Sequence, residues 1–298
     1  MAFDLKQYAS RVRLTDGAWG TQLHKLGLPP GSPGEIWNVA QPSAVEQVAA
    51  GYVQAGSDVI LTNTLLANRF ILAQHGVEKR VAELAEAGAL ISRRAADQAR
   101  SAGRDVKVFA SIGPTGIIVM MGEVPKDAVA AAFAETAEAV AFGGADAIVL
   151  ETFNELDEIA IAIEAVRKVT DLPIVASMTF ASGPDKTCTM MGSKPADLAA
   201  TAKRLGASAV GANCGAGPKD YVKVAALLRE ASDLPVWIKA NAGLPVMTRD
   251  GAAFPMGPDE FASFVPDLIR AGANFIGGCC GTTPDHIRAI RQAIDRAR

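Results

Sequence analysis

Eight short apolar runs of strand length are spaced along the whole chain, and each gap between them is long enough to hold a helix. Parallel strands need crossover connections of roughly a dozen residues or more, and these are usually helices. The alternation therefore predicts a parallel α/β architecture. The predicted strands are residues 12–16, 58–64, 106–112, 147–152, 173–179, 208–213, 235–241 and 274–278.

A short internal repeat indicates that these units are equivalent. A glycine that ends a helix-like segment precedes the second, fourth, sixth and eighth predicted strands, at Gly56, Gly143–Gly144, Gly206 and Gly272. Glycine ends helices because it accepts a left-handed backbone conformation. Eight such units without a break in composition predict a (β/α)8 TIM barrel, one domain spanning residues 1–298. No G-x-G-x-x-G motif follows the first run, which disfavours two dinucleotide-binding halves.

Two of the connecting segments carry clear helix signals. From Val129 to Val140, apolar residues recur at the spacing of one helix face. Near the end of the chain, Thr283 is a typical helix N-cap, and Pro284 follows at the favoured first helical position. Both segments are therefore predicted to be helices that cover the barrel.

The composition excludes several classes of protein. Hydrophobic residues make up 49% of the chain and charged residues 20%, as in globular proteins. A net charge of −3 with both signs interspersed disfavours nucleic acid or an anionic membrane as a partner. No apolar run reaches the roughly 20 residues of a membrane span, and residues 1–13 lack the apolar segment of a secretory signal. We therefore expect a cytoplasmic protein that acts on small molecules.

Three of the four cysteines fall at the ends of predicted strands. Cys214 follows the sixth strand, and Cys279 and Cys280 follow the eighth, so all three belong to the catalytic rim of a barrel. Three thiolates that leave one position open form a catalytic rather than a structural zinc site. The alternative is that the adjacent pair packs as small buried hydrophobic residues. Cys188 lies in the loop after the fifth strand and is interpreted as structural.

The glycines around the cysteine pair have a predicted role. Successive side chains of a strand point to opposite faces, so adjacent cysteines in a regular strand cannot both reach one ion. We expect Gly277, Gly278 and Gly281 to let the chain leave strand geometry and turn both sulfurs inward.

A three-thiolate site favours one kind of chemistry. A free thiol with a pKa near 8.5 is mostly protonated at neutral pH, whereas coordination to a metal deprotonates it. Three thiolate ligands leave a fourth, substrate thiolate electron-rich, which suits activation of a thiol nucleophile. None of His24, His75 or His286 lies at a predicted strand end, so no histidine ligand and no Ser–His pair is expected.

Two acidic residues also lie at the rim. Asp16 and Glu151 end the first and fourth predicted strands and are suited to holding the ammonium group of an amino acid. The structural alternatives are that Asp16 caps a turn before Gly17 and that Glu151 pairs with a neighbouring base. Glu151 directly follows an apolar run, so its charge needs a partner.

Several motifs together resemble the homocysteine S-methyltransferase family over nearly the whole chain. They are GGCCGTTP at 277–284, GANC at 211–214, TDGA at 15–18, TNT at 62–64, ETF at 151–153 and NAGLP at 241–245. The resemblance implies a barrel in which Cys214, Cys279 and Cys280 bind Zn²⁺. It also implies that Asp16 and Glu151 hold the amino-acid head of homocysteine, in a pocket lined by Gly17, Thr64 and Asn213. Direct methyl transfer to the thiolate would form methionine without a proton-transferring side chain.

The methyl donor is indicated by different stretches. Residues 35–38, 113–116 and 190–192 look like those of bacterial betaine–homocysteine S-methyltransferases, so betaine is the favoured donor. Trp37 is a candidate to face the quaternary ammonium group through a cation–π contact; its alternative is packing over the barrel mouth. Leu65-Leu66 replaces the aromatic residue usual after the second strand, a departure at the donor side.

Other readings stay open. The family also uses S-methylmethionine, or a methyl-corrinoid as in cobalamin-dependent methionine synthase, whose homocysteine-binding domain this chain resembles as well; a corrinoid protein is then a partner. A class I aldolase would instead use Lys239, near the end of the seventh strand, as a Schiff-base amine. A non-catalytic subunit that docks onto a corrinoid protein is the remaining alternative.

Overall fold

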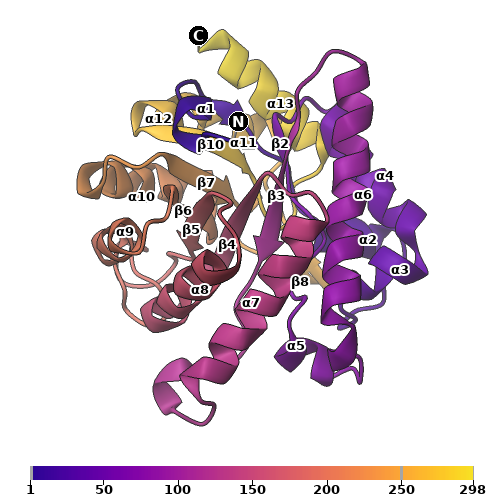
Figure 1. Cartoon of the computed structure of the whole chain (residues 1–298). Coiled ribbons are helices and arrows are strands. Elements are labelled where there is room, and N and C mark those ends of the chain that lie inside the picture. Colours follow the sequence, from indigo (N-terminus) through magenta and orange to yellow (C-terminus); the bar gives the residue numbers. More distant parts are fainter. Residues whose placement is uncertain (1–2, 249–250, 298) are drawn as a thin grey trace.

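The fold is a barrel of eight parallel strands, seen in a computed structural model that describes residues 3–248 and 251–297. The strands are hydrogen-bonded in the order β1-β10-β7-β6-β5-β4-β3-β2, and every pair among them is parallel. Each predicted run overlaps one strand, which confirms the (β/α)8 prediction (Figure 1). The strands are β1 (Arg13–Leu14), β2 (Val59–Ile60), β3 (Lys107–Ile112), β4 (Ala147–Phe153), β5 (Ile174–Met178), β6 (Ala209–Cys214), β7 (Val236–Ala240) and β10 (Ala273–Gly278).

Asp58 joins the two strands at the ends of this sheet. Its backbone N–H donates to the carbonyl of Leu14 in β1 at 2.7 Å. Its carboxylate accepts the N–H of Leu14 at 2.8 Å and also pairs with Arg291 at 3.0 Å. A side chain thus replaces part of the ladder between β1 and β2, and the barrel is nearly closed.

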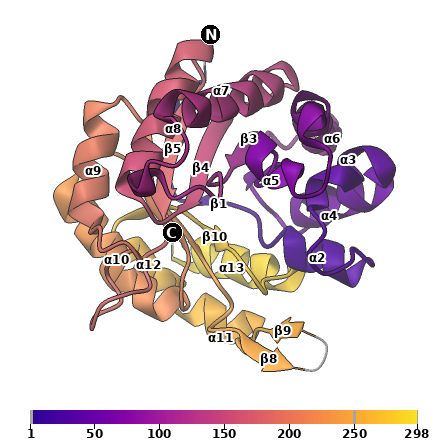
Figure 2. The same ribbon diagram turned by 90° about the horizontal axis from the view of Figure 1, so that it is seen from below.

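Helices follow the strands and form the outer layer (Figure 2). The longer ones are α4 (Pro42–Gln54), α6 (Val81–Ser101), α7 (Lys126–Phe142), α8 (Leu156–Val169), α9 (Pro195–Arg204), α10 (Pro218–Ala231) and α13 (Pro284–Arg296). Shorter helices are α1 (Leu5–Tyr8), α2 (Gly20–Lys25), α3 (Trp37–Ala40), α5 (Arg69–Ala73), α11 (Pro258–Ser263) and α12 (Val265–Arg270), with 3-10 turns η1 (Gly34–Ile36), η2 (Glu78–Arg80) and η3 (Val119–Met121). Among the described residues, no helix is long and apolar enough to cross a membrane.

The two predicted helix signals and the glycine repeat are confirmed. Helix α7 buries the predicted apolar face, and Thr283 is the N-cap of α13, where its N–H donates to His286 Nδ1 at 3.2 Å. The four repeat glycines that end helices all have left-handed backbones, with φ of +105°, +86°, +77° and +96° at Gly56, Gly144, Gly206 and Gly272. Each glycine lets the chain reverse from a helix into the next strand.

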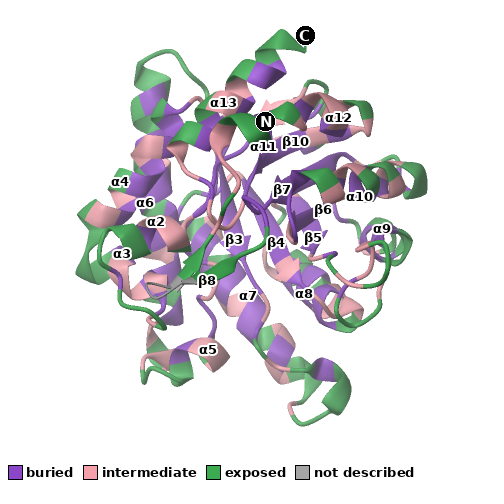
Figure 3. Cartoon of the chain, turned by 180° about the vertical axis from the view of Figure 1, so that it is seen from behind, coloured by how far each residue is buried: buried purple, intermediate pink, exposed green. Residues whose placement is uncertain are grey.

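The core has two layers, one inside the barrel and one between the strands and the helices (Figure 3). Inside, the rings of Phe109, Trp237 and Phe275 pack together, with centroids 5.3 to 6.1 Å apart. Leu5 of α1 and Ala9 belong to the same interior cluster and cover its amino-terminal end. Apolar side chains therefore fill the lower barrel, which leaves the carboxyl end of the strands for a site.

The loop after β7 contains structure that the sequence pattern does not predict. Val246–Thr248 (β8) and Gly251–Ala253 (β9) form an antiparallel hairpin. The side chains of Leu244, Val246 and Met247 are exposed. The hairpin stands at the same end of the barrel as α5, which follows β2 (Figures 1 and 2).

Candidate active site

The three rim cysteines lie together. The sulfurs of Cys214, Cys279 and Cys280 are all within 4.8 Å of one another, and those of Cys214 and Cys279 are 3.2 Å apart. All three residues are partly buried. Cys214 ends β6 and the pair follows β10, so two strands separated in the sheet by β7 supply the cluster.

Cys214 reaches the cluster through an unusual backbone. Residues 209, 211 and 213 alternate on one side of β6, so the next side chain would point to the opposite side in a regular strand. Cys214 instead has φ of +62°, a left-handed conformation that few non-glycine residues adopt. Asn241 supports the turn, because its N–H donates to the Cys214 carbonyl at 3.1 Å and its side-chain amide to the Gly215 carbonyl at 2.7 Å.

The glycines before the cysteine pair act differently from the prediction. Gly277 and Gly278 remain inside β10 instead of leaving strand geometry. They are needed for space, because a β-carbon at Gly277 would overlap Thr15 and one at Gly278 would overlap Thr282. The chain turns only after the strand, where Gly281 has φ of +81° and the Thr282 N–H donates to the Cys279 carbonyl at 3.1 Å.

The cysteine cluster has the chemistry of a metal site. Hydrogen bonding to Cys279 and Cys280, with burial, raises the pKa of Cys214 well above its usual value. A hydrogen bond with Cys214 lowers the pKa of Cys279, but the bond with Cys280 and burial outweigh it and raise that pKa to about 12. Hydrogen bonds from both neighbours lower the pKa of Cys280 to about 4. Three thiolates so close together need a cation, and three thiols with an open side fit Zn²⁺.

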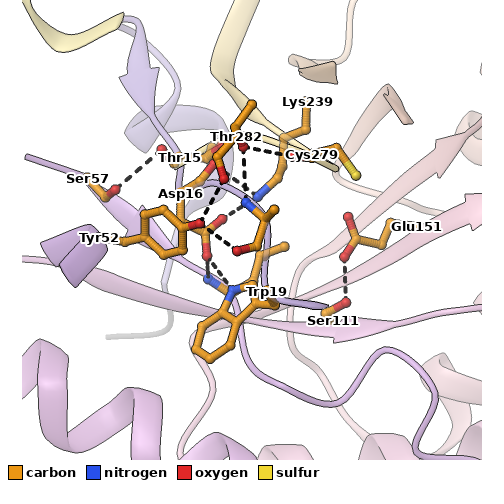
Figure 4. A network of polar contacts seen from close by, with 12 residues as sticks. Thr15, Asp16, Trp19, Tyr52, Ser57, Ser111, Glu151, Lys239, Cys279 and Thr282 are labelled. Carbon is orange, nitrogen blue, oxygen red and sulfur yellow. Dashed lines mark hydrogen bonds and ion pairs between the residues drawn. The ribbon is translucent and has the colours of Figure 1, made fainter. Parts of the chain in front are cut away.

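Glu151 lies on the barrel interior beside this cluster. It belongs to β4, is 6% exposed, and accepts a hydrogen bond from Ser111 Oγ at 2.5 Å (Figure 4). Burial raises its pKa to about 7, although the Lys239 ammonium opposes the shift. Because only one carboxylate oxygen has this partner, the other is available to a positively charged ligand.

Asp16 is fully buried beneath the pocket. One carboxylate oxygen forms an ion pair with Lys239 of β7, and the other accepts hydrogen bonds from the Leu61 N–H at 2.7 Å and Trp19 Nε1 at 2.8 Å (Figure 4). Lys239 Nζ also donates to the Asp16 carbonyl at 3.2 Å. Lys239 was predicted only as a possible Schiff-base amine, and its ion pair with Asp16 was not predicted. Its position two residues after the interior Trp237 is the signal that it points into the barrel.

A cavity of about 400 Å³ opens at this end of the barrel. Its lining includes Cys214, Cys279, Cys280, Glu151, Lys239, Gly17, Trp19, Leu65 and Leu66. A larger hollow of about 710 Å³ between α9 and α10 contains Cys188, which was predicted to be structural, and none of the predicted site residues. The smaller cavity is the candidate active site, because the thiol cluster, the Glu151 carboxylate and the Lys239 ammonium group all line it.

Two of the residues predicted to bind the substrate, Thr64 and Asn213, lie behind the lining of the cavity. Thr64 and Asn213 are fully buried. Thr64 Oγ1 donates to the Ser111 carbonyl at 2.6 Å, and Asn213 Oδ1 accepts from the Thr152 N–H at 2.8 Å, so each holds the backbone beside the cavity. Trp37 packs from α3 against the outer hydrophobic core. Trp19, for which no role was predicted, lines the cavity.

A TIM barrel with three thiols and a carboxylate around one rim cavity defines a candidate thiol-ligand metalloenzyme site. Comparison with known proteins gives the particular family. The profile of "Homocysteine S-methyltransferase" matches residues 13–294, and the chain belongs to this family.

Individual relatives agree with this assignment. The chain is 33% identical to methionine synthase of Mycobacterium leprae and 34% identical to that of Mycobacterium tuberculosis, over 98% and 96% of its own length. It spans about a quarter of the length of these curated relatives, 25% in both cases. The metallated form of the homocysteine methyltransferase MmuM from Escherichia coli has the same fold, with a TM-score of 0.79, 24% identity, and coverage of 95% of this chain and 96% of that one.

Proposed function

We propose that this chain transfers a methyl group from an onium donor, betaine first among the candidates, to the sulfur of homocysteine, giving methionine. The observation that carries the proposal is the opening of the Cys214, Cys279 and Cys280 cluster into the same cavity as Glu151. Membership of the family supports homocysteine as the acceptor. Four free cysteines fit a reducing compartment, so we place the reaction in the cytoplasm.

The three cysteines are the proposed zinc ligands. Bound there, Zn²⁺ would keep the substrate sulfur as a thiolate, the nucleophilic form, at neutral pH. The three sulfurs lie within 4.8 Å of one another, which is compatible with Zn–S bonds of about 2.3 Å in a tetrahedral arrangement. The relative MmuM has been solved in a metallated form, which supports the assignment.

The amino-acid head of homocysteine lies in this proposal at the floor of the cavity. Glu151 binds the ammonium group through its free carboxylate oxygen, and the backbone at Gly17 forms the adjoining wall. Thr64 and Asn213 hold the backbone of Ser111 and Thr152, which line another side of the cavity. Asp16 contributes from below as the partner of Lys239.

The methyl-transfer step does not require proton transfer to or from the protein. The substrate sulfur forms a bond to the methyl carbon while the donor nitrogen leaves with the bonding electron pair, so no side chain has to accept a proton. The protein aligns the two reactants and keeps water out with the apolar side chains of Leu65, Leu66 and Trp19. The Trp19 ring lines the cavity and is suited to a quaternary ammonium group, while Trp37 packs against the outer hydrophobic core.

A second donor is supported by the comparisons. Methionine synthases of two mycobacteria match the chain at 33% and 34% identity but are about four times as long. In that alternative, a separate methyl-corrinoid protein delivers the methyl group to the same acceptor site.

The test is a methyl-transfer assay on zinc-loaded protein with homocysteine and, separately, betaine, S-methylmethionine and methylcobalamin. Methionine from betaine supports the full proposal, and methionine from another donor keeps the acceptor and corrects the donor. If no donor yields methionine and titration shows no binding of homocysteine, the proposal is wrong. Borohydride trapping of Lys239 with a carbonyl substrate would instead favour the aldolase alternative.

A further inference from the structure

A polar layer covers the apolar interior of the barrel. Phe109, Val149 and Trp237 belong to the interior cluster, and the residues two positions later on the same strands are Ser111, Glu151 and Lys239. Because side chains alternate along a strand, these three also point inward, one layer closer to the cavity. Glu151 and Lys239, which carry charges of opposite sign, therefore lie in the same layer at the bottom of the cavity.

Asp16 accepts hydrogen bonds from the Lys239 ammonium group, which also lies 6.0 Å from the centroid of the Trp237 ring. This ammonium group has three N–H donors, and the described contacts use two acceptors, the carbonyl and one carboxylate oxygen of Asp16. The Lys239 side chain is 2% exposed and lines the cavity. One donor thus remains for a group inside the cavity, in a desolvated position where a charge-assisted hydrogen bond is strong.

Asp16 is poorly placed to receive a substrate ammonium group. Its carboxylate already accepts from Lys239, Leu61 and Trp19, and none of its surface is exposed. Its contacts fix the position of Lys239 instead. Asp16 therefore acts on the cavity indirectly, because it holds the ammonium group of Lys239 in place there.

We propose that Lys239 binds the carboxylate of the amino-acid substrate while Glu151 binds its ammonium group, so that Lys239 determines selectivity for thiols that carry a carboxylate. The inference rests on the proposed function and deepens it. In this arrangement the charges alternate from Asp16 through Lys239, the substrate carboxylate and the substrate ammonium to Glu151. Each buried charge then has a neighbour of opposite sign, as burial requires.

The test compares three thiols that differ by one charged group. Homocysteine carries both groups, 3-mercaptopropylamine lacks the carboxylate, and 4-mercaptobutyrate lacks the ammonium group. Dissociation constants are measured calorimetrically on the zinc-loaded protein without a donor, and kcat/KM with the donor that supports turnover. We expect the wild type to prefer homocysteine over 3-mercaptopropylamine by about 10- to 100-fold, the range for one hydrogen bond to a charged group.

The informative variant removes both partners of the ion pair. Lys239→Met alone strands the Asp16 charge in the interior, so the double variant Asp16→Asn/Lys239→Met is used. We expect it to bind homocysteine and 3-mercaptopropylamine within about threefold of each other, while its preference for homocysteine over 4-mercaptobutyrate stays as in the wild type. Glu151→Gln should show the converse pattern. Lys239→Arg, which keeps a cation, should restore part of the carboxylate preference.

One control variant and two readouts keep the outcomes distinct. Lys223→Met removes an exposed lysine that pairs with Asp185 and should leave all three affinities unchanged. If the double variant keeps the full preference for a carboxylate, or loses affinity for all three thiols equally, Lys239 has only a structural role and the inference is wrong. If the wild type binds none of the three thiols, the proposed function fails with it.

Discussion

Lys239 and Asp16 form an ion pair inside the barrel, with 2% and 0% of their side chains exposed. Taking two charges out of water costs several kcal/mol each, which their attraction does not reliably offset. Such a pair is therefore weak evidence for stability, and its place beside the cavity indicates a functional use. The pair also joins the loop after β1 to β7, residues separated by 223 positions in the sequence.

Breaking this pair on one side should destabilise the fold strongly. Lys239→Met leaves Asp16 buried without its cation, and we expect a loss of about 3–5 kcal/mol in the free energy of unfolding. The double variant Asp16→Asn/Lys239→Met removes both charges and should recover most of that loss. Urea unfolding of the wild type, both single variants and the double variant measures the coupling. Additive losses in the double variant would contradict the prediction.

Removing any thiol of the cluster should abolish metal binding. Cys214→Ala, Cys279→Ala and Cys280→Ala are each expected to lose stoichiometric zinc and to lower methyl transfer by more than about 100-fold, since even indirect partners of a metal ligand cost 10- to 100-fold. Zinc content and the absorption of cobalt-substituted protein measure the first effect. Cys188→Ala is the matched control, because Cys188 lies in the separate hollow between α9 and α10. Full zinc content in any of the three variants would exclude that cysteine as a ligand.

The fold was predictable because its signals are local. Apolar runs, helix-length gaps and glycines such as Gly56 and Gly272 each act within a few residues, and together they indicate a barrel. The cysteine cluster was also predictable, since strand ends of a barrel converge at one rim. In contrast, the hairpin of β8 and β9 has no strong strand pattern and was not foreseen.

What could not be predicted depends on contacts across the barrel. Nothing near Lys239 in the sequence identifies Asp16 as its partner, and the left-handed backbone of Cys214 follows from packing around its strand end. The role of Gly277 is likewise set by Thr15, a residue of the opposite end of the chain that lies where a β-carbon would be. Sequence patterns place residues on a rim, but tertiary packing decides which side chains meet there.

Gly17 should tolerate no side chain, although the neighbouring Gly20 should. A β-carbon at Gly17 would lie 2.8 Å from the Tyr52 ring and 2.9 Å from Thr282 Oγ1, whereas one at Gly20 meets nothing within 4 Å. We expect Gly17→Ala to lower the free energy of unfolding by about 1–3 kcal/mol, as overpacking does. Because Gly17 lines the cavity, the variant should also raise the KM for homocysteine.

The matched control for this substitution is Gly20→Ala, at the start of helix α2. Both glycines line the same cavity, so they differ mainly in the space around them. Urea unfolding and steady-state kinetics on the two variants test the prediction. Equal stability of Gly17→Ala and Gly20→Ala would show that the loop after β1 adjusts freely.

Glu151 should make stability depend on pH in a defined direction. Burial raises its pKa from the usual 4.5 to about 7 in the folded protein. As the pH rises from 4.5 to 7, the unfolded chain releases this proton and the folded protein retains it, so the folded state loses stability relative to the unfolded state. At 1.36 kcal/mol per pKa unit, the loss approaches about 3 kcal/mol and is complete above pH 7.

Glu151→Gln removes this titration while keeping the shape of the side chain. The free energy of unfolding of the wild type minus that of the variant should therefore fall by up to about 3 kcal/mol between pH 4.5 and pH 7.5, and then stay constant. Urea unfolding of chelator-treated protein across this range gives the difference, in which the other titrating groups cancel. A difference that is flat or rises with pH would mean that folding does not raise the pKa of Glu151. The Glu151 carboxylate would then already be charged at neutral pH before the ammonium group of the substrate binds. Its titration would add no pH dependence to the affinity for homocysteine near pH 7.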